Sequence, residues 1–203
     1  MTSPHCLGCI RSDYAEALDA FVSDCRSVGI ASVLWFAWSE RSVPDPRPQL
    51  ERAGIHVETL TLMPGCSIRD FDEIFASAGS RMRERLARGP MCDLVFLTDD
   101  YMAMGVLPVL LERGIRIPED ICLVTLRNKG CGPAFTKSVA AIESDPRQRG
   151  TCLAEQILDW FETGSFAARP MAPRYVRGET FPVGNQGLKS VHGTPNNKRR
   201  TTR

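Results

Sequence analysis

Apolar positions along the chain alternate between helical spacing and short continuous runs typical of buried strands. The helical spacing predicts helices over residues 14–28, 67–88 and 101–112, and a later helix marked by Leu153, Ile157, Leu158 and Phe161 that ends near Gly164. The apolar runs predict strands over 30–38, 56–62, 92–97, 121–126, 139–142 and 174–181. Three prolines within 42–48 exclude a helix across that stretch, so we expect a loop, or at most a late helix start, before a turn at 49–52.

The longest predicted helix begins at Ser67, whose hydroxyl can accept a hydrogen bond from the amide of Asp70. Its expected buried stripe comprises Ile68, Phe71, Ile74, Phe75, Ala78, Met82 and Leu86.

Short apolar strands that alternate with helices predict an α/β fold, in which helices flank both faces of a parallel sheet. Ligands of such folds bind beyond the carboxyl ends of the strands. Asp99 and Asp100 follow the predicted strand 92–97 directly, in the stretch "FLTDDYMAMG". Their position therefore favours a ligand-binding role beside the simpler one of capping the helix that follows.

Composition narrows the classes of protein. The 203 residues carry a formal net charge of +1, which does not indicate a strongly charged partner. No apolar run is long enough to span a membrane, and the first residues do not resemble a signal peptide, so eight scattered cysteines are expected as reduced thiols in the cytoplasm. Residues 185–203 carry basic residues and no acidic ones, and are expected to form a disordered tail.

Motifs for catalysis, metals and cofactors are weak. His5, Cys6 and Cys9 form only half of a zinc-site pattern, so we expect no metal. The sequence has no nucleophile elbow, dinucleotide fingerprint or phosphate-binding loop, so we expect no catalytic residues and no cofactor. Two carboxylates adjacent in a strand would also point to opposite faces, which disfavours an acid–base pair at Asp99 and Asp100.

Residues 93–124, "DLVFLTDDYMAMGVLPVLLERGIRIPEDICLV", resemble the effector-binding domain of LacI/GalR-type transcriptional regulators. The stretch combines a strand, an acidic pair, a helix rich in Ala, Met and Gly, and an Ile-Pro-Glu-Asp turn before a second strand. Weaker similarity extends the resemblance to residues 9–184. It implies a periplasmic-binding-protein-like (type I) C-terminal lobe with a partial N-terminal lobe. It also implies that the helix-turn-helix and most of the N-terminal lobe are absent from this chain.

The resemblance assigns candidate ligand contacts. Asp100 corresponds to the effector-contacting carboxylate, and Asp99 stands where the family commonly has Asn. Arg41 is the better placed of two candidates for the arginine that clamps the effector. Arg127 and Asn128 occupy a strand end where the family usually has a glycine and an acidic residue.

Aromatic residues add one more candidate. Trp35, Phe36 and Trp38 could stack on a sugar or purine, and Trp38, nearest the strand end, is our choice for the cleft, with at least one of the others in the core.

We therefore expect a cytoplasmic domain that senses a small molecule, sugar-like or purine-like, for a LacI-type regulator. The resemblance implies a homodimer that contacts DNA only through a head absent from this chain, and no contact with membranes. Two alternatives stay open at this point: a solute-binding module of the same fold in transport, and an enzyme on a flavodoxin-like sheet.

Overall fold

The computed structural model describes residues 11–62, 71–165 and 169–181. Its elements, in chain order, are α1 (Ala15–Ser27), β1 (Ser32–Ala37), α2 (Arg47–Arg52), β2 (His56–Thr61), α3 (Phe71–Ala87), β3 (Leu94–Leu97), α4 (Asp100–Glu112), β4 (Cys122–Asn128), β5 (Ala140–Ser144), α5 (Pro146–Thr163) and β6 (Arg174–Val176). The expected α/β fold class is confirmed.

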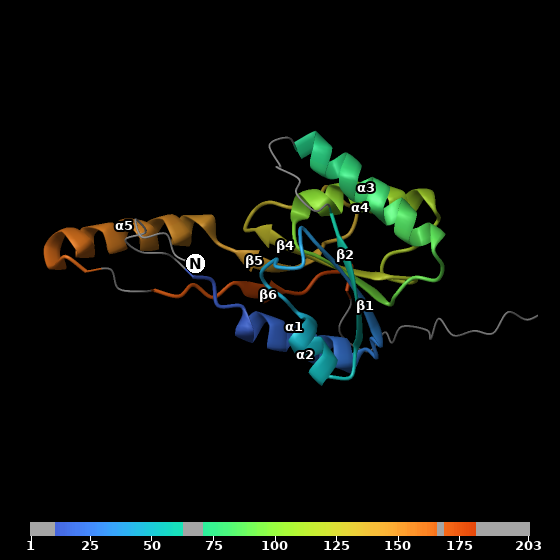
Figure 1. The fold of residues 1–203 in the computed structure, drawn as a ribbon, viewed down its shortest axis with the longest axis horizontal. Helices are drawn as coiled ribbons and strands as arrows, with labels where there is room; N and C mark the ends of the chain where they lie inside the picture. The colour runs from blue at the N-terminus through green and yellow to red at the C-terminus, as the bar shows by residue number, and fades with distance from the viewer. Residues whose placement is uncertain (1–10, 63–70, 166–168, 182–203) are drawn as a thin grey trace, which may run out of the picture.

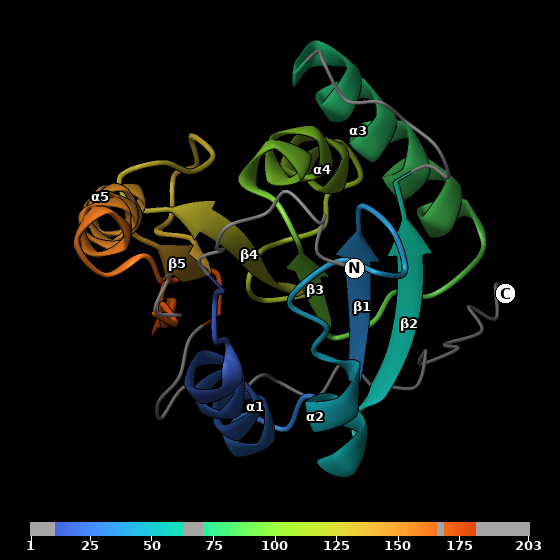
Figure 2. The ribbon, with the colours of Figure 1, turned by 60° about the vertical axis from the view of Figure 1, so that its left-hand side comes forward.

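The strands form one sheet in the order β2-β1-β3-β4-β5-β6. Neighbours from β2 to β5 are parallel, and β6 alone runs antiparallel, beside β5. Helices α1 and α2 cover one face of the sheet, whereas α3 and α4 cover the other, as Figure 1 and Figure 2 show. Helix α5 covers neither face and extends away from the sheet (Figure 1).

Burial of both sheet faces explains why the central strands are continuously apolar. All four residues of β3 and the last five residues of β1 are buried. Their alternating side chains supply two cores, one beneath α3 and α4 and one beneath α1 and α2. Trp35 and Phe36 belong to these two cores, one on each face, as expected for at least one of them.

Helix α2 begins at Arg47, which agrees with the late helix start that the sequence left open, and a proline is tolerated in its first turn. Helix α5 begins at Pro146, after an Asp145 cap, and ends at Thr163, before Gly164 as predicted. Two sequence predictions are corrected. Phe71, predicted in the buried stripe, is 57% exposed. The last strand ends at Val176 instead of Phe181.

The predicted Ser67 cap, the half zinc site at residues 5–9 and the tail 185–203 lie outside the described residues. Within the described ranges, no helix combines the length and the apolar character that crossing a membrane requires.

Candidate functional site

The strand order creates a switch point between β1 and β3. From β1 the chain moves outward to β2, then returns to the other side of β1 to form β3 and continues in the opposite direction to β4. The connections after β1 and β3 therefore leave toward opposite faces, and open parallel sheets bind ligands beyond the carboxyl ends of the strands at such a point. Trp38 follows β1 and Thr98 follows β3, and the Trp38 amide donates to the Thr98 hydroxyl at 3.3 Å.

Asp99 lies at this switch point and caps helix α4. Its Oδ1 accepts a hydrogen bond from the Tyr101 amide at 2.8 Å. Burial raises the pKa of the Asp99 carboxyl, whereas the Tyr101 amide and, to a smaller extent, the nearby Trp38 side chain act to lower it. The sequence leaves both carboxylates as candidates for the cap, and Asp99 fills that role because it has the extended backbone of an N-cap residue.

Asp100 is the first residue of α4 and is 7% exposed. Burial raises the pKa of its carboxyl, and the positive charge of Arg127 acts in the opposite direction. Arg127 lies on β4, and its Nε donates to Glu143 of β5 at 3.1 Å. The backbone amides of Asp100 and Tyr101 also act to lower the pKa of the Asp100 carboxyl, and the charge of Arg127 is already shared with Glu143.

Aromatic rings from two helices stack beside the acidic pair. The rings of Phe71 and Tyr101 stack with centroids 4.5 Å apart and planes inclined by 23°, and Phe75 stacks on Tyr101 at 6.0 Å. Phe71 begins α3 and Tyr101 follows Asp100 in α4, so both rings lie at the carboxyl edge of the sheet. The buried stripe predicted from the sequence includes Phe71. Its place in the first turn of a helix that follows a strand was the signal that its ring could lie at the carboxyl edge of the sheet instead.

The remaining candidates lie farther out. Arg41 is exposed in the loop after β1, where its backbone amide donates to the Ser39 hydroxyl at 3.3 Å. Asn128 ends β4, is exposed, and uses its carbonyl to accept from the Cys131 amide at 2.9 Å. The structure therefore brings Trp38, Asp99 and Asp100 together, with Arg127 at the edge of the group.

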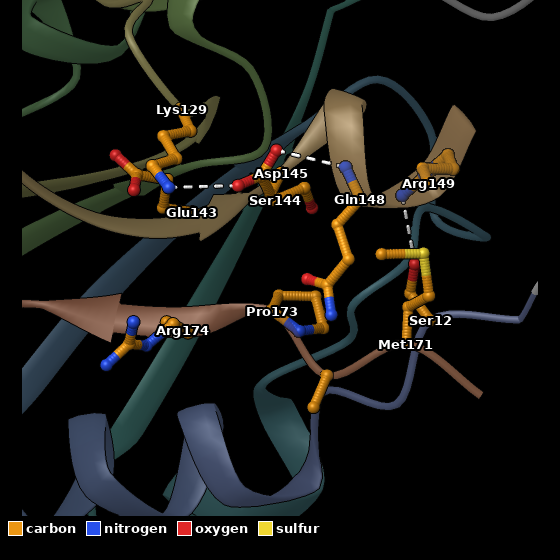
Figure 3. A pocket seen from close by; sticks show the side chains of 11 residues that line it. Ser12, Lys129, Glu143, Ser144, Asp145, Gln148, Arg149, Met171, Pro173 and Arg174 are labelled. Atoms are coloured by element: carbon orange, nitrogen blue, oxygen red, sulfur yellow. Dashed lines mark hydrogen bonds and ion pairs between the residues drawn. The ribbon is translucent and has the colours of Figure 1, made fainter. Parts of the chain in front are cut away.

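A cavity of about 280 Å³ lies next to this group, where α5 begins (Figure 3). Its lining includes Glu143, the partner of Arg127, but none of the candidate ligand residues. Lys129 pairs with Asp145 at 2.9 Å, and Arg149 donates to the Ser12 hydroxyl at 3.1 Å. Because the cavity contains none of the candidate ligand residues, we keep the switch point as the candidate site.

The described part of the chain shows no metal site, and burial makes two of its thiols unreactive. No group of three or more His, Cys, Asp or Glu side chains is arranged there to hold a metal ion. Burial raises the pKa of the Cys92 thiol to about 11 and that of Cys122 to about 12, which keeps both protonated and unreactive. His56 begins β2, at the opposite edge of the sheet from Asp99.

Replacing Asp99 with alanine is expected to lower the free energy of unfolding by about 1 kcal/mol, because the first turn of α4 loses its cap. Asp99→Asn keeps an oxygen acceptor and should stay close to wild type. Urea denaturation followed by circular dichroism measures both variants. Equal losses for the two would show that charge, rather than the cap, is what matters at this position.

Comparisons with known proteins agree with this architecture. Residues 59–181 match the family model described as a periplasmic binding protein-like domain, which covers more than half of the chain. The chain belongs to this family. No curated protein sequence gives a significant match.

Solved structures place the fold more narrowly. A LacI family transcriptional regulator from Arthrobacter sp. FB24, in complex with lactose, is similar with a TM-score of 0.69 and 19% identity over 90% of this chain and 70% of that one. A sugar-binding LacI family regulator from Enterococcus faecalis gives 0.69 and 21% over 90% and 68%. One from Escherichia coli, complexed with phosphate, gives 0.66 and 14% over 86% and 63%. The chain therefore has the fold of LacI family regulators, as the sequence resemblance predicted.

Proposed function

We propose that this chain is the effector-sensing domain of a LacI-type transcriptional regulator. The observation that carries the proposal is the meeting of Trp38, Asp99 and Asp100 at the switch point of a periplasmic-binding-protein-like sheet. Similar structures include regulators in complex with lactose and with phosphate, which supports a small polar effector.

The chemistry of the site supports a polyhydroxylated or purine-like effector. The buried Asp100 carboxyl offers oxygen acceptors to two hydroxyl groups or to a ring N–H, and such hydrogen bonds are stronger when the acceptor is ionised. The exposed Phe71 ring, stacked on Tyr101, offers a flat apolar surface for a sugar face or a base. Trp38, near the same carboxylates, is partly buried against the core that Phe75 and Tyr101 also contact.

Regulation in this proposal follows from ligand-dependent change of shape. An effector that binds one arrangement of the domain better than another shifts the population toward it, and two copies in a homodimer would transmit that shift to DNA. The described residues contain no helix-turn-helix, so DNA contact would come from a unit outside them. The protein would act in the cytoplasm, without catalysis and without a membrane partner.

A thermal-shift screen of mono- and disaccharides, purine bases and nucleosides tests the proposal. A true effector at a hundredfold excess over its Kd stabilises the folded state by about 2.7 kcal/mol, or about 5–10 °C for a chain of this size. Asp100→Asn keeps the shape of the side chain but removes its charge, and should weaken binding about tenfold or more.

Asp19→Asn is the matched control, because it removes the same charge from the exposed surface of α1. It should respond to the effector as wild type does. An effector that stabilises wild type and Asp100→Asn equally would overturn the site assignment. Failure of every sugar and purine to stabilise the wild-type chain would count against the proposed function itself.

A further inference from the structure

A cavity of about 280 Å³ lies at the base of helix α5, and we call it the α5 cavity (Figure 3). Its wall is formed by the first turn of α5, the end of β5, Lys129, Ser12 and the segment 171–174. Ser12 and Met171 belong to segments far apart in the chain that meet in an isolated parallel bridge. None of the residues assigned to the switch point lines the α5 cavity, so a ligand here would occupy a second site.

Both carboxylates in the wall already have cationic partners. Asp145 pairs with Lys129 at 2.9 Å, and Glu143 pairs with Arg127 at 3.1 Å. Asp145 also accepts hydrogen bonds from two backbone amides in the first turn of α5, so this helix end is already capped. A ligand would therefore be recognised by the polar side chains that remain.

Two arginines of the wall carry charges that no carboxylate of the described residues balances. Arg149, on α5, donates to the neutral hydroxyl of Ser12 at 3.1 Å. Arg174, on β6, is exposed, and no ion pair within the described ranges includes it. Two unbalanced positive charges at one cavity attract an anion, and the planar guanidinium group matches the geometry of phosphate and carboxylate oxygens.

Neutral groups complete the wall. Figure 3 shows the side chain of Gln148 extending from α5 toward Pro173, and its amide has no partner among the residues drawn. This amide offers two N–H donors. Met171 and Pro173 are buried and give the cavity an apolar side as well. The volume lies just below the range of roughly 300–1,000 Å³ that is typical of ligand pockets, so the ligand is small.

We propose that the α5 cavity binds a small phosphate monoester. Arg149 and the Gln148 amide hold the phosphate oxygens, and Arg174 balances the remaining charge. A phosphate monoester carries about −1.5 to −2 charges at pH 7, which matches the two unbalanced arginines, whereas a carboxylate supplies a single charge. The apolar side at Met171 and Pro173 contacts the short organic group, so free phosphate should bind less tightly than a monoester.

Binding at this place would tie helix α5 to the sheet. The helix extends as a separate arm, and no other described helix or strand packs along it (Figure 1). The phosphate joins Arg149, in the arm, to the segments that carry Ser12 and Arg174. Because a ligand that binds only the ordered state suppresses local opening, amides in the first turns of α5 should exchange with solvent more slowly when the site is filled.

Glycerol 3-phosphate, inorganic phosphate and glycerol are the probes, each compared with sodium chloride at equal ionic strength. Calorimetric titration of the full chain should give binding for glycerol 3-phosphate, weaker binding for inorganic phosphate and none for glycerol. At ten times its Kd, glycerol 3-phosphate should raise the Tm by about 3–6 °C. Hydrogen exchange at residues 150–153 should slow with glycerol 3-phosphate and not with glycerol.

Arg149→Gln should raise the Kd for glycerol 3-phosphate about tenfold or more, because it removes a charge-assisted contact. Arg174→Gln should raise the Kd about threefold, through the loss of a nearby charge. Arg147→Gln is the matched control: it removes the same charge from an exposed position of α5 outside the cavity wall, and should keep the Kd within about twofold. Circular dichroism confirms that all three variants keep the wild-type helix content.

Absence of binding by both phosphates at about 20 mM, well above a millimolar Kd, overturns the inference. Equal losses of affinity in Arg147→Gln and Arg149→Gln do the same, since the effect would then be one of general surface charge. Asp100→Asn should bind glycerol 3-phosphate as wild type does, and a changed affinity would place the anion at the switch point instead. Unchanged exchange in α5 despite binding would overturn the tie between the arm and the sheet. Effector binding at the switch point is measured with sugars and purines, so either site can fail without the other.

Discussion

Phe21→Ala is expected to lower the free energy of unfolding by about 3–5 kcal/mol, the largest effect of any substitution we consider. Phe21 is fully buried on α1 and contacts three aromatic rings: Phe96 at 5.2 Å, Tyr175 at 6.0 Å and Phe181 at 6.1 Å. Aromatic pairs contribute beyond the area that they bury, so truncation removes both a large apolar side chain and these ring contacts.

The loss is large compared with the 5–15 kcal/mol that a typical domain has in total. Urea denaturation followed by circular dichroism measures it. Phe21→Leu is the control, because it keeps most of the volume and should cost about 1–1.5 kcal/mol. If alanine and leucine cost the same small amount, α1 is not held to the sheet through this ring.

The rings around Phe21 show which features a sequence pattern can predict and which it cannot. Helical spacing over 14–28 identified Phe21 as buried, because an amphipathic helix turns one stripe toward the core. The pattern carries no information about its partners, since Phe96 and Tyr175 are distant in sequence and meet Phe21 only when the sheet forms. Contacts across the sheet depend on strand order, which local periodicity does not encode.

The acidic pair Asp99 and Asp100 shows the same limit at the candidate site: the pattern locates the pair but does not assign the role of each residue. The sequence placed Asp99 and Asp100 at the end of a strand and the start of a helix, which the structure confirms. The pattern treats them as strand neighbours with opposed side chains, and it leaves the cap open between them. The choice between the two depends on where the backbone turns helical, and that differs by one residue from the boundary that the pattern suggested.

Exposed apolar residues mislead sequence reasoning for a different reason. Phe71, Ile157 and Phe161 have the spacing of core residues, and a periodic pattern cannot show whether another layer covers them. In α3 the side chain of Phe71 is 57% exposed although its ring stacks on Tyr101. In α5 the side chains of Ile157 and Phe161 are exposed because no other described helix or strand packs along this helix. The exposed Phe71 ring lies at the surface to which we assign ligand contacts.

The crossing of α3 and α4 links stability to the site. At this crossing a glycine in α4, Gly105, lies against the backbone of α3: a Cβ at Gly105 would stand 2.3 Å from the Phe75 carbonyl oxygen and 3.0 Å from its carbon. The close approach holds the two helices together over their first turns, which carry Phe71 and Tyr101.

Gly105→Ala is therefore expected to destabilise the fold by about 2 kcal/mol. Alanine favours the helix by about 1 kcal/mol over glycine. Overpacking costs about 1–3 kcal/mol or more, and here the clash is with backbone, which no rotamer change can relieve. The clash outweighs the gain because α3 as a whole must move away from α4.

Gly79→Ala is the matched control on the facing helix. Its Cβ would stand 3.1 Å from the Gly105 carbonyl oxygen, a tight contact rather than an overlap, so its cost should stay within about 1 kcal/mol. Because Gly105→Ala moves α3 away from α4, it should also separate the Phe71–Tyr101 stack and weaken the thermal shift produced by an effector. A Gly105→Ala variant at least as stable as wild type would show that the helices do not approach this closely, and the aromatic surface at the site would lose the support that we assign to it.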